Sequence, residues 1–400
     1  MTERQPMDFG KGLALGGLRL PQFDVTKVTE IDMESLKEIV DAFQAGGYNY
    51  YDTSWFYHGG HSETALGELV IDRYPREQIL FSNKMPLKFM TKQEQMEEVF
   101  EKQLRKCHVD YFDFYLLHQL GIDLYDRWEN FGIFEFLMQK REEGKIRYFG
   151  ASFHQTPEFV DKVLTEHPEL DFVMLQLNYI DWDSPTLRAR ELYDVAVKHD
   201  KPIVVMEACK GGILANVPDE AQKLMKDYNP DASIASWAYR WVKSLPQVGA
   251  VTVGMPKMEF LLDNMKTFDD FKPMNDEEYA IIDKVIDIIN SQTAIACTNC
   301  KYCEEVCPKN IAIGDYFALY NEGKRQNLGA STYWNEVDTQ VIQYTNIIEE
   351  RGKASDCINC KKCERICPQH LEVVKYLAEN IVPEIEMMDP TLRIIDQVDN

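Results

Sequence analysis

The sequence predicts an α/β protein in which a closed (β/α)8 barrel is followed by a small, mostly helical domain. Two observations carry this prediction. Short apolar runs alternate with amphipathic patterns over the first 270 of 400 residues, and a duplicated cysteine motif begins at Cys297. A connecting helix is expected between these two regions. The predicted divisions are therefore a barrel over 1–270, a connecting helix over 271–296 and a second domain over 297–400.

Eight apolar runs are expected to be the strands of the barrel. Their apolar character is continuous rather than alternating, as is typical of parallel strands covered on both faces. Eight strand–helix units fit a closed barrel. An open, doubly wound sheet is the alternative, but no G-x-G-x-x-G motif follows the first run. In order, the runs are Leu13–Leu18, Tyr48–Tyr51, Ile79–Ser82, Phe112–Leu117, Ile146–Gly150, Phe172–Leu177, Ile203–Met206 and Val248–Val253.

Between these runs, apolar residues recur at steps of three and four, which predicts amphipathic helices. The same pattern predicts a helix at Asp276–Ile289, with acidic residues in its first turn, and helices at Tyr316–Tyr320 and Val337–Glu350. Residues after Val382 are expected to form a tail that packs on the surface or extends from it. Predicted barrel helices include Ser35–Ala45, Gln93–Cys107, Ile133–Glu143, Leu187–His199 and Ser233–Ser244.

The overall charge excludes some classes of partner. The formal net charge is −23, and nucleic acids and anionic membrane surfaces are bound through basic patches. No apolar run reaches membrane-spanning length, and residues 1–12 lack the regions of a secretory signal. We therefore expect a cytoplasmic protein that binds neither nucleic acid nor membrane, in a compartment where thiols stay reduced.

Two copies of the motif C-x2-C-x2-C-x3-C-P use eight of the ten cysteines. This spacing wraps the backbone round a [4Fe–4S] cluster and ends at a proline, and in two-cluster modules the fourth cysteine of each motif binds the other cluster. Two [4Fe–4S] clusters are therefore predicted. One would be held by Cys297, Cys300, Cys303 and Cys367, and the other by Cys357, Cys360, Cys363 and Cys307.

Zinc and disulfides are the alternatives for these cysteines. Zinc takes four ligands as two separated pairs and gives a third, closely spaced cysteine no role. Disulfides belong to secreted chains. The clusters therefore remain the better prediction, and they imply single-electron chemistry.

Polar residues stand just past the ends of the predicted strands, where (β/α)8 enzymes gather their chemistry. Tyr57 could act as a general acid, with the charge of Lys84 lowering its pKa. Asp52 could hold Lys84, and His118 could bond the reacting oxygen. Together these four residues predict a proton-transfer site.

Three stretches of the sequence resemble the aldo-keto reductase family: Gly47–Tyr57, Phe81–Lys84 and Asp110–His118. The resemblance covers roughly residues 1–270 and includes Glu63, which matches the family's usual Ser-Glu helix start. It implies a barrel that reduces carbonyl compounds with a nicotinamide cofactor. It also implies a catalytic tetrad of Asp52, Tyr57, Lys84 and His118, in which Tyr57 donates the proton. The C-terminal motifs look like those of an iron–sulfur-containing branch, found in anaerobes, with a ferredoxin-like dicluster domain.

The cofactor pocket departs from the family pattern. Ser152 is followed by Phe153 where the family usually has asparagine, although Gln176 and nearby Asn178 fit the carboxamide site. Glu207 stands where an aromatic residue often stacks on the nicotinamide. Lys257 replaces the usual basic pair for a 2′-phosphate, and Asn264 matches a residue that contacts adenine.

A flavin would explain both this departure and the clusters. Clusters pass electrons singly, whereas a carbonyl or conjugated alkene takes two together, and a flavin can connect the two processes. Barrels bind phosphate at the loops after strands seven and eight, where Gly211, Gly212 and Gly254 would let backbone N–H groups approach it. We therefore expect FMN or NADP(H) in the barrel.

The sequence thus predicts an oxidoreductase that passes electrons between two clusters and a barrel-bound cofactor to reduce a small molecule. An external ferredoxin or flavodoxin is the expected protein partner, and Lys301, Lys361 and Lys362 could form its docking site. The alternative is an electron carrier or redox sensor whose barrel is not catalytic. An intact tetrad counts against that alternative.

Overall fold

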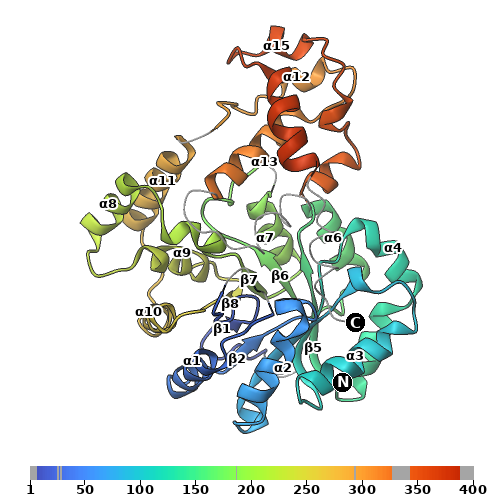
Figure 1. The fold of residues 1–400 in the computed structure, drawn as a ribbon, viewed down its shortest axis with the longest axis vertical. Coiled ribbons are helices and arrows are strands. Elements are labelled where there is room, and N and C mark those ends of the chain that lie inside the picture. Colours follow the sequence, from blue (N-terminus) through green and yellow to red (C-terminus); the bar gives the residue numbers. More distant parts are fainter. Residues whose placement is uncertain are drawn as a thin grey trace.

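A computed structural model describes residues 7–24, 27, 29–185, 187–291, 294–326 and 343–387. Its centre is a closed barrel in which each strand pairs in parallel with its neighbours in chain order and β8 returns to β1 (Figure 1). The predicted (β/α)8 fold is confirmed. The strands are β1 (Leu13–Gly16), β2 (Tyr50–Asp52), β3 (Leu80–Met85), β4 (Phe112–Leu117), β5 (Ile146–Phe153), β6 (Phe172–Gln176), β7 (Ile203–Met206) and β8 (Val248–Val253).

The interior of the barrel is filled by side chains at the N-terminal side of the strands. Tyr50 and Phe114 stack with ring centroids 4.9 Å apart, and Phe9 stacks on the same Phe114 ring at 5.4 Å. Met174 and Val204 belong to the same buried cluster. Packed aromatic side chains leave this end with no room for a ligand, so a site must lie at the C-terminal ends of the strands, here called the mouth.

The barrel helices cover the outside of the strands and bury their apolar faces in one large core. Local capping fixes where several begin: Asp32, Thr156 and Ser233 each accept a hydrogen bond from the backbone N–H three residues later. The helices are α1 (Met33–Ala45), α2 (Ser62–Leu66), α3 (Gln95–Lys106), α4 (Ile122–Asn130), α5 (Ile133–Glu142), α6 (Pro157–Glu166), α7 (Ala189–Lys198), α8 (Asp219–Tyr228), α9 (Ile234–Lys243) and α10 (Met258–Asp269).

Helix α11 (Asp276–Ser291) follows the barrel at the predicted place and packs against α8. The C-terminal domain beyond it has its own buried core, which includes Phe317, Leu377 and Ile381. Its elements are α12 (Tyr302–Glu305), α13 (Ile313–Gln326), the 3-10 turn η6 (Ala354–Asp356), α15 (Lys362–Ile366), α16 (Val373–Tyr376) and the π-helix η7 (Leu377–Glu386).

Two segments of the C-terminal domain can be compared with their predicted structure. The tail expected after Val382 packs on the domain as far as Glu386, because the chain continues as a π-helix through Pro383 and buries Ile385. Of the helix predicted over Val337–Glu350, residues 337–342 lie outside the described residues, and residues 343–348 are helical.

The C-terminal domain lies over the mouth of the barrel (Figure 1). Helix α13 runs towards the loop after β7, where Lys210 binds Glu322. Asn346 donates a hydrogen bond of 3.0 Å to the backbone oxygen of His154, just after β5. Both domains therefore contact the loops in which a ligand of the barrel would lie.

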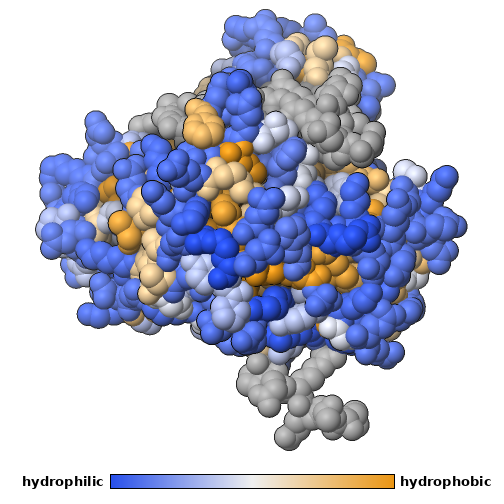
Figure 2. Space-filling view, turned by 60° about the horizontal axis from the view of Figure 1, so that its bottom comes forward, coloured by the Kyte–Doolittle hydropathy of each residue, from blue (hydrophilic) through white to orange (hydrophobic). Residues whose placement is uncertain are grey.

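Hydrophilic side chains predominate on the face seen in Figure 2, and apolar residues surface only in smaller areas between them. Within the described parts of the chain, no helix combines the length and apolar character needed to span a membrane. On the C-terminal domain, large apolar side chains are exposed at Tyr302, Ile358 and Ile366.

Candidate active site and cluster sites

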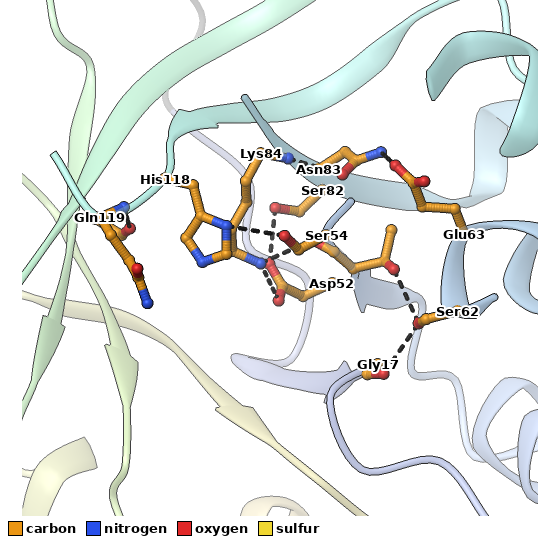
Figure 3. Close-up of polar contacts among 12 residues, drawn as sticks. Gly17, Asp52, Ser54, Ser62, Glu63, Ser82, Asn83, Lys84, His118 and Gln119 are labelled. Atoms are coloured by element: carbon orange, nitrogen blue, oxygen red, sulfur yellow. Dashed lines mark hydrogen bonds and ion pairs between the residues drawn. The ribbon is translucent and has the colours of Figure 1, made fainter. Parts of the chain in front are cut away.

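The four residues expected to form a catalytic tetrad come together at the mouth. Asp52 ends β2, Lys84 lies in β3, His118 follows β4, and Tyr57 begins a 3-10 turn after β2. The Lys84 ammonium lies 2.5 Å from Asp52 Oδ1 and donates to the Thr53 carbonyl at 2.8 Å (Figure 3). The same ammonium is 4.9 Å from the centroid of the Tyr57 ring.

Burial sets the protonation state of this site. The pKa of Tyr57 is raised well above its ordinary value by burial and by the negative charges of Asp52 and Glu207. This differs from the expectation that Lys84 lowers it. Burial also lowers the pKa of Lys84, against the opposing effect of Asp52. Tyr57 is therefore held as the phenol, the form that can donate a proton.

His118 is fixed by its neighbours as a neutral ring. Ser54 Oγ lies 2.8 Å from its Nδ1 (Figure 3), and Phe56 stacks on the imidazole with ring centroids 5.0 Å apart. Burial lowers the pKa of His118 well below its usual range, with further contributions from Lys84 and His154. The Tyr57 and His118 rings lie edge to face with centroids 6.0 Å apart, and a neutral imidazole can act as donor or acceptor.

Glu63 binds the strand that carries Lys84. Its buried carboxylate accepts hydrogen bonds from Asn83 and Gln103, both at 2.9 Å, and forms an ion pair of 2.7 Å with Lys106. Since Asn83 directly precedes Lys84 in β3, this network fixes the strand that carries the lysine. Glu63 is thus a positioning residue of the site.

Opposite the tetrad, Gln176 and Asn178 converge on Asp181, a residue that no sequence pattern singled out. Both side-chain amides donate to Asp181 Oδ2, at 3.0 and 2.7 Å. Asp181 Oδ1 in turn lies 2.5 Å from the ammonium of Lys210, and Lys210 lies 2.5 Å from Glu322 in α13. The C-terminal domain therefore reaches the residues expected to hold the cofactor.

The loops after β7 and β8 lie beside Arg19, which no sequence pattern singled out either. Arg19 Nη1 donates to the Gly211 carbonyl at 2.8 Å, and Nη2 is buried with no hydrogen-bond partner among the described residues. A Cβ on Gly254 would come within 2.7 Å of the Arg19 side chain, so this glycine makes room for the arginine. Gly211 and Gly212 have φ angles of +65° and +102°, which favour glycine.

The remaining predicted cofactor residues are more dispersed. Ser152 is buried, and its hydroxyl accepts a hydrogen bond of 2.8 Å from the backbone N–H of Gln119, the residue that follows His118 in Figure 3. Lys257 is exposed at the start of α10 and lies 3.8 Å from Glu259. Asn264 is buried within α10. Of these three, Lys257 is the least enclosed by protein.

The eight motif cysteines line two neighbouring cavities in the C-terminal domain. The members of each cavity are those expected from exchange of the fourth cysteine, and Ile313 at the start of α13 lines both. Among the described residues, no three ligating side chains converge closely enough for a single metal ion. The first cavity is lined by Cys297, Cys300, Cys303 and Cys367, and the second by Cys307, Cys357, Cys360 and Cys363.

The proposed docking lysines have different surroundings. Lys301 forms an ion pair of 3.0 Å with Asp315, and both residues line a hollow together with Trp182 of the barrel. Lys361 and Lys362 are exposed beside the second cavity. Lys301 of the first motif therefore lies beside the barrel, whereas Lys361 and Lys362 of the second motif lie beside its cavity.

Comparison with protein families finds two matches. The aldo/keto reductase family matches residues 12–287, and the 4Fe-4S dicluster domain matches residues 296–372. An uncharacterised oxidoreductase of Bacillus subtilis, YqkF, is 24% identical over 250 residues, which cover 55% of this chain and 78% of that protein. One subunit of an ion-translocating oxidoreductase complex of Buchnera aphidicola is 29% identical over 93 residues, covering 23% of this chain and only 15% of that subunit.

Solved structures with the same barrel include three aldo-keto reductases. AKR11C1 of Bacillus halodurans (holo form) has a TM-score of 0.54 at 22% identity, covering 68% of this chain and 91% of that one. A Klebsiella pneumoniae aldo-keto reductase in complex with NADPH has a TM-score of 0.54 at 20% identity and coverages of 69% and 90%. The thermostable Tm1743 has a TM-score of 0.56 at 20% identity and coverages of 68% and 94%.

These likenesses at low identity show the fold, and the family match covers most of the chain. The chain therefore belongs to the aldo/keto reductase family and is an oxidoreductase with a C-terminal 4Fe-4S dicluster domain.

Proposed function

We propose that this enzyme reduces a carbonyl compound or conjugated alkene, with Tyr57 as proton donor and electrons passing between two [4Fe–4S] clusters and a cofactor in the barrel. The observation that carries the proposal is the placement of the C-terminal domain. Its helix α13 contacts the loop after β7 through Glu322 and Lys210, directly over the mouth that holds the tetrad.

The tetrad supplies proton transfer to an oxygen or carbon of the substrate. Tyr57, kept protonated by burial, is the acid. Lys84, held by Asp52, stabilises the phenolate that remains after transfer. His118, fixed through Ser54, is placed to hydrogen-bond the reacting oxygen.

The eight cysteines fit two [4Fe–4S] clusters, because each cavity is lined by four thiols from both motifs. Clusters bound there would supply or accept single electrons. Helix α13 connects the cysteine cavities to the barrel. Ile313 lines both cavities, and Glu322, nine residues later, forms the ion pair with Lys210. At 1.5 Å per residue this is about 14 Å along the helix axis.

Two atoms suggest how a barrel cofactor would be held. Gln176 Oε1 and Arg19 Nη2 are both buried and have no hydrogen-bond partner among the described residues. Gln176 Oε1 could accept from an amide or imide N–H, since its own amide nitrogen is used by Asp181. Arg19 could donate to a phosphate near Gly211. These features suit FMN and NADP(H) equally, and the Klebsiella relative was solved with NADPH.

An external acidic ferredoxin or flavodoxin is the proposed electron donor, acting in the cytoplasm. The second motif offers exposed Lys361 and Lys362 together with Ile358, whose side chain is 57% exposed. Positive charge round an apolar centre suits a transient acidic partner. Association should therefore weaken as salt is raised, and Lys362→Glu should slow it.

Turnover of a Tyr57→Phe variant tests the proposal. The protein is purified anaerobically, and its bound cofactor is identified by the absorption spectrum and by extraction. Tyr57→Phe should lose turnover of aldehydes and enones by at least about 10²-fold, the usual contribution of a general acid, with the iron content unchanged. Tyr111→Phe, at the opposite end of β4, is the matched control because its hydroxyl contacts only Arg147 in the described structure. Equal turnover of both variants would instead favour an electron carrier or sensor with a non-catalytic barrel.

A further inference from the structure

Glu207 has an unusual backbone at the mouth of the barrel. It directly follows β7 with φ +58°, a conformation that a residue with a side chain rarely adopts. Its carbonyl accepts from Asn178 Nδ2 at 3.1 Å and from the backbone N–H of Lys210 at 2.9 Å. Strained backbone of this kind persists only where its surroundings hold it, and it gathers at functional sites.

Glu207 and Tyr57 both lie in loops at the mouth of the barrel. Tyr57 lies in the loop after β2 and Glu207 in the loop after β7, and the carboxylate form of Glu207 raises the pKa of the Tyr57 hydroxyl. Both side chains are partly exposed, whereas Asp52 and Lys84 are buried beneath Tyr57. The mouth is therefore lined by two acids, one phenolic and one carboxylic.

The surroundings of Glu207 favour its protonated form. Burial raises its pKa, and Asp181 acts in the same direction, while Arg19, Lys210 and the Gly211 N–H oppose them. The charge of Lys210 is already shared between Asp181 and Glu322, each 2.5 Å away. Arg19 is partly engaged by the Gly211 carbonyl. The ionisable groups that act on Glu207 are Arg19, Tyr57, Asp181, Cys209 and Lys210.

Electron supply decides how many protons the protein must provide. A hydride brings two electrons and one hydrogen together, so carbonyl reduction then needs one proton. When the electrons arrive singly, each pair of electrons must be joined by two protons, one that completes the hydride equivalent delivered to carbon and one on oxygen, to give the alcohol. Tyr57 can supply one of these protons, and a second acid is needed for the other.

We propose that Glu207 is the second proton donor of the site, delivering the proton that a hydride would otherwise bring. The inference rests on the proposed function, because it applies to turnover driven by a one-electron donor. Glu207 gives up its proton towards the mouth, the electrons come from the reduced donor, and solvent reprotonates the carboxylate between turnovers.

The test compares two electron sources in the full-length enzyme with its clusters intact. Reduced methyl viologen supplies single electrons and NADPH supplies hydride, with methylglyoxal and cinnamaldehyde as probe substrates. In Glu207→Gln, the ratio of viologen-driven to NADPH-driven turnover should fall by about 10²-fold, as for other general acids. Glu259→Gln is the control, since Glu259 is 68% exposed in the first turn of the neighbouring helix α10.

Two further measurements separate a proton donor from a structural role. Viologen-driven turnover should decline as pH rises through the raised pKa of Glu207, and this decline should be missing in Glu207→Gln. Infrared spectra should contain a protonated-carboxyl band that shifts in heavy water and is absent from Glu207→Gln. This second measurement needs no turnover.

The outcomes distinguish this inference from the proposed function. If the wild-type enzyme accepts no electrons from reduced viologen for either probe, the proposed function fails. If it does accept them, but Glu207→Gln keeps the same ratio, pH dependence and infrared band, the role of Glu207 is overturned and the proposed function stands.

Discussion

Removing the charge of Lys210 is predicted to lower the free energy of unfolding of the C-terminal domain, so that it unfolds before the barrel. The Lys210 ammonium is buried between Asp181 of the barrel and Glu322 of the C-terminal domain. Burial alone would lower the pKa of Lys210, but the two carboxylates reverse this and raise it. Lys210, Asp181 and Glu322 therefore bring one positive and two negative charges together within a few ångströms.

The size of the effect follows from which charge is removed. Lys210→Met leaves two buried carboxylates without their cation, and breaking a buried pair in this way costs about 3–5 kcal/mol. Glu322→Gln leaves Lys210 paired with Asp181 and keeps a hydrogen-bond acceptor, so about 1–3 kcal/mol is expected. The predicted order of destabilisation is therefore Lys210→Met greater than Glu322→Gln.

Anaerobic urea unfolding measures this order with one probe for each domain. Cluster absorbance reports the C-terminal domain, and tryptophan fluorescence reports mainly the barrel, whose sequence holds five of the six tryptophans. In the wild-type enzyme the two transitions should lie close together, and in Lys210→Met the C-terminal domain should unfold at lower urea. The control is Lys223→Met, whose pair with Asp227 is 73% and 62% exposed and should contribute less than about 1 kcal/mol. Equal midpoint shifts for Lys210→Met and Lys223→Met would refute the reasoning.

Three further predictions concern the active site and the cysteines. Lys84→Met should reduce turnover by at least about 10²-fold while leaving cluster absorbance unchanged, because Tyr57 loses its cationic neighbour; near-normal kcat would contradict this. The pH profile of kcat/KM should show no change near about pH 6.5, the ordinary pKa of histidine, because the pKa of His118 is lowered well below that value. A change there that disappears in His118→Gln would contradict this prediction. Cys363→Ser should lower iron and sulfide content by about half, whereas Cys209→Ser, outside both cavities, should keep both; iron loss from the second variant alone would reverse the assignment.

Strand positions could be predicted well because the barrel buries both faces of each strand. The apolar runs Phe112–Leu117, Ile203–Met206 and Val248–Val253 coincide with β4, β7 and β8. The third strand was expected to stop at Ser82 but continues to Met85. Asn83 and Lys84 are polar because the first bonds Glu63 of α2 and the second bonds Asp52 at the mouth, so apolar continuity ends before the strand does.

The tetrad could be found from sequence because each member stands at a fixed place beside a strand. Arg19, Asp181 and Glu322 could not, since no local pattern marks them. Lys210 and Glu322 are 112 positions apart and meet only after the second domain has docked. Such pairs depend on tertiary contacts, and charged residues on loops are usually solvated, so sequence alone gives no reason to single them out.

The central claim is that electrons pass from the C-terminal domain to the barrel. The most direct measurement is anaerobic stopped-flow absorbance of dithionite-reduced enzyme, freed of excess reductant and mixed with a carbonyl substrate. We predict that the clusters reoxidise as reduced product forms, with two electrons lost per product, and that Tyr57→Phe slows both processes together. Clusters that stay reduced while NADPH-driven turnover of the same substrate proceeds at its normal rate would contradict the claim.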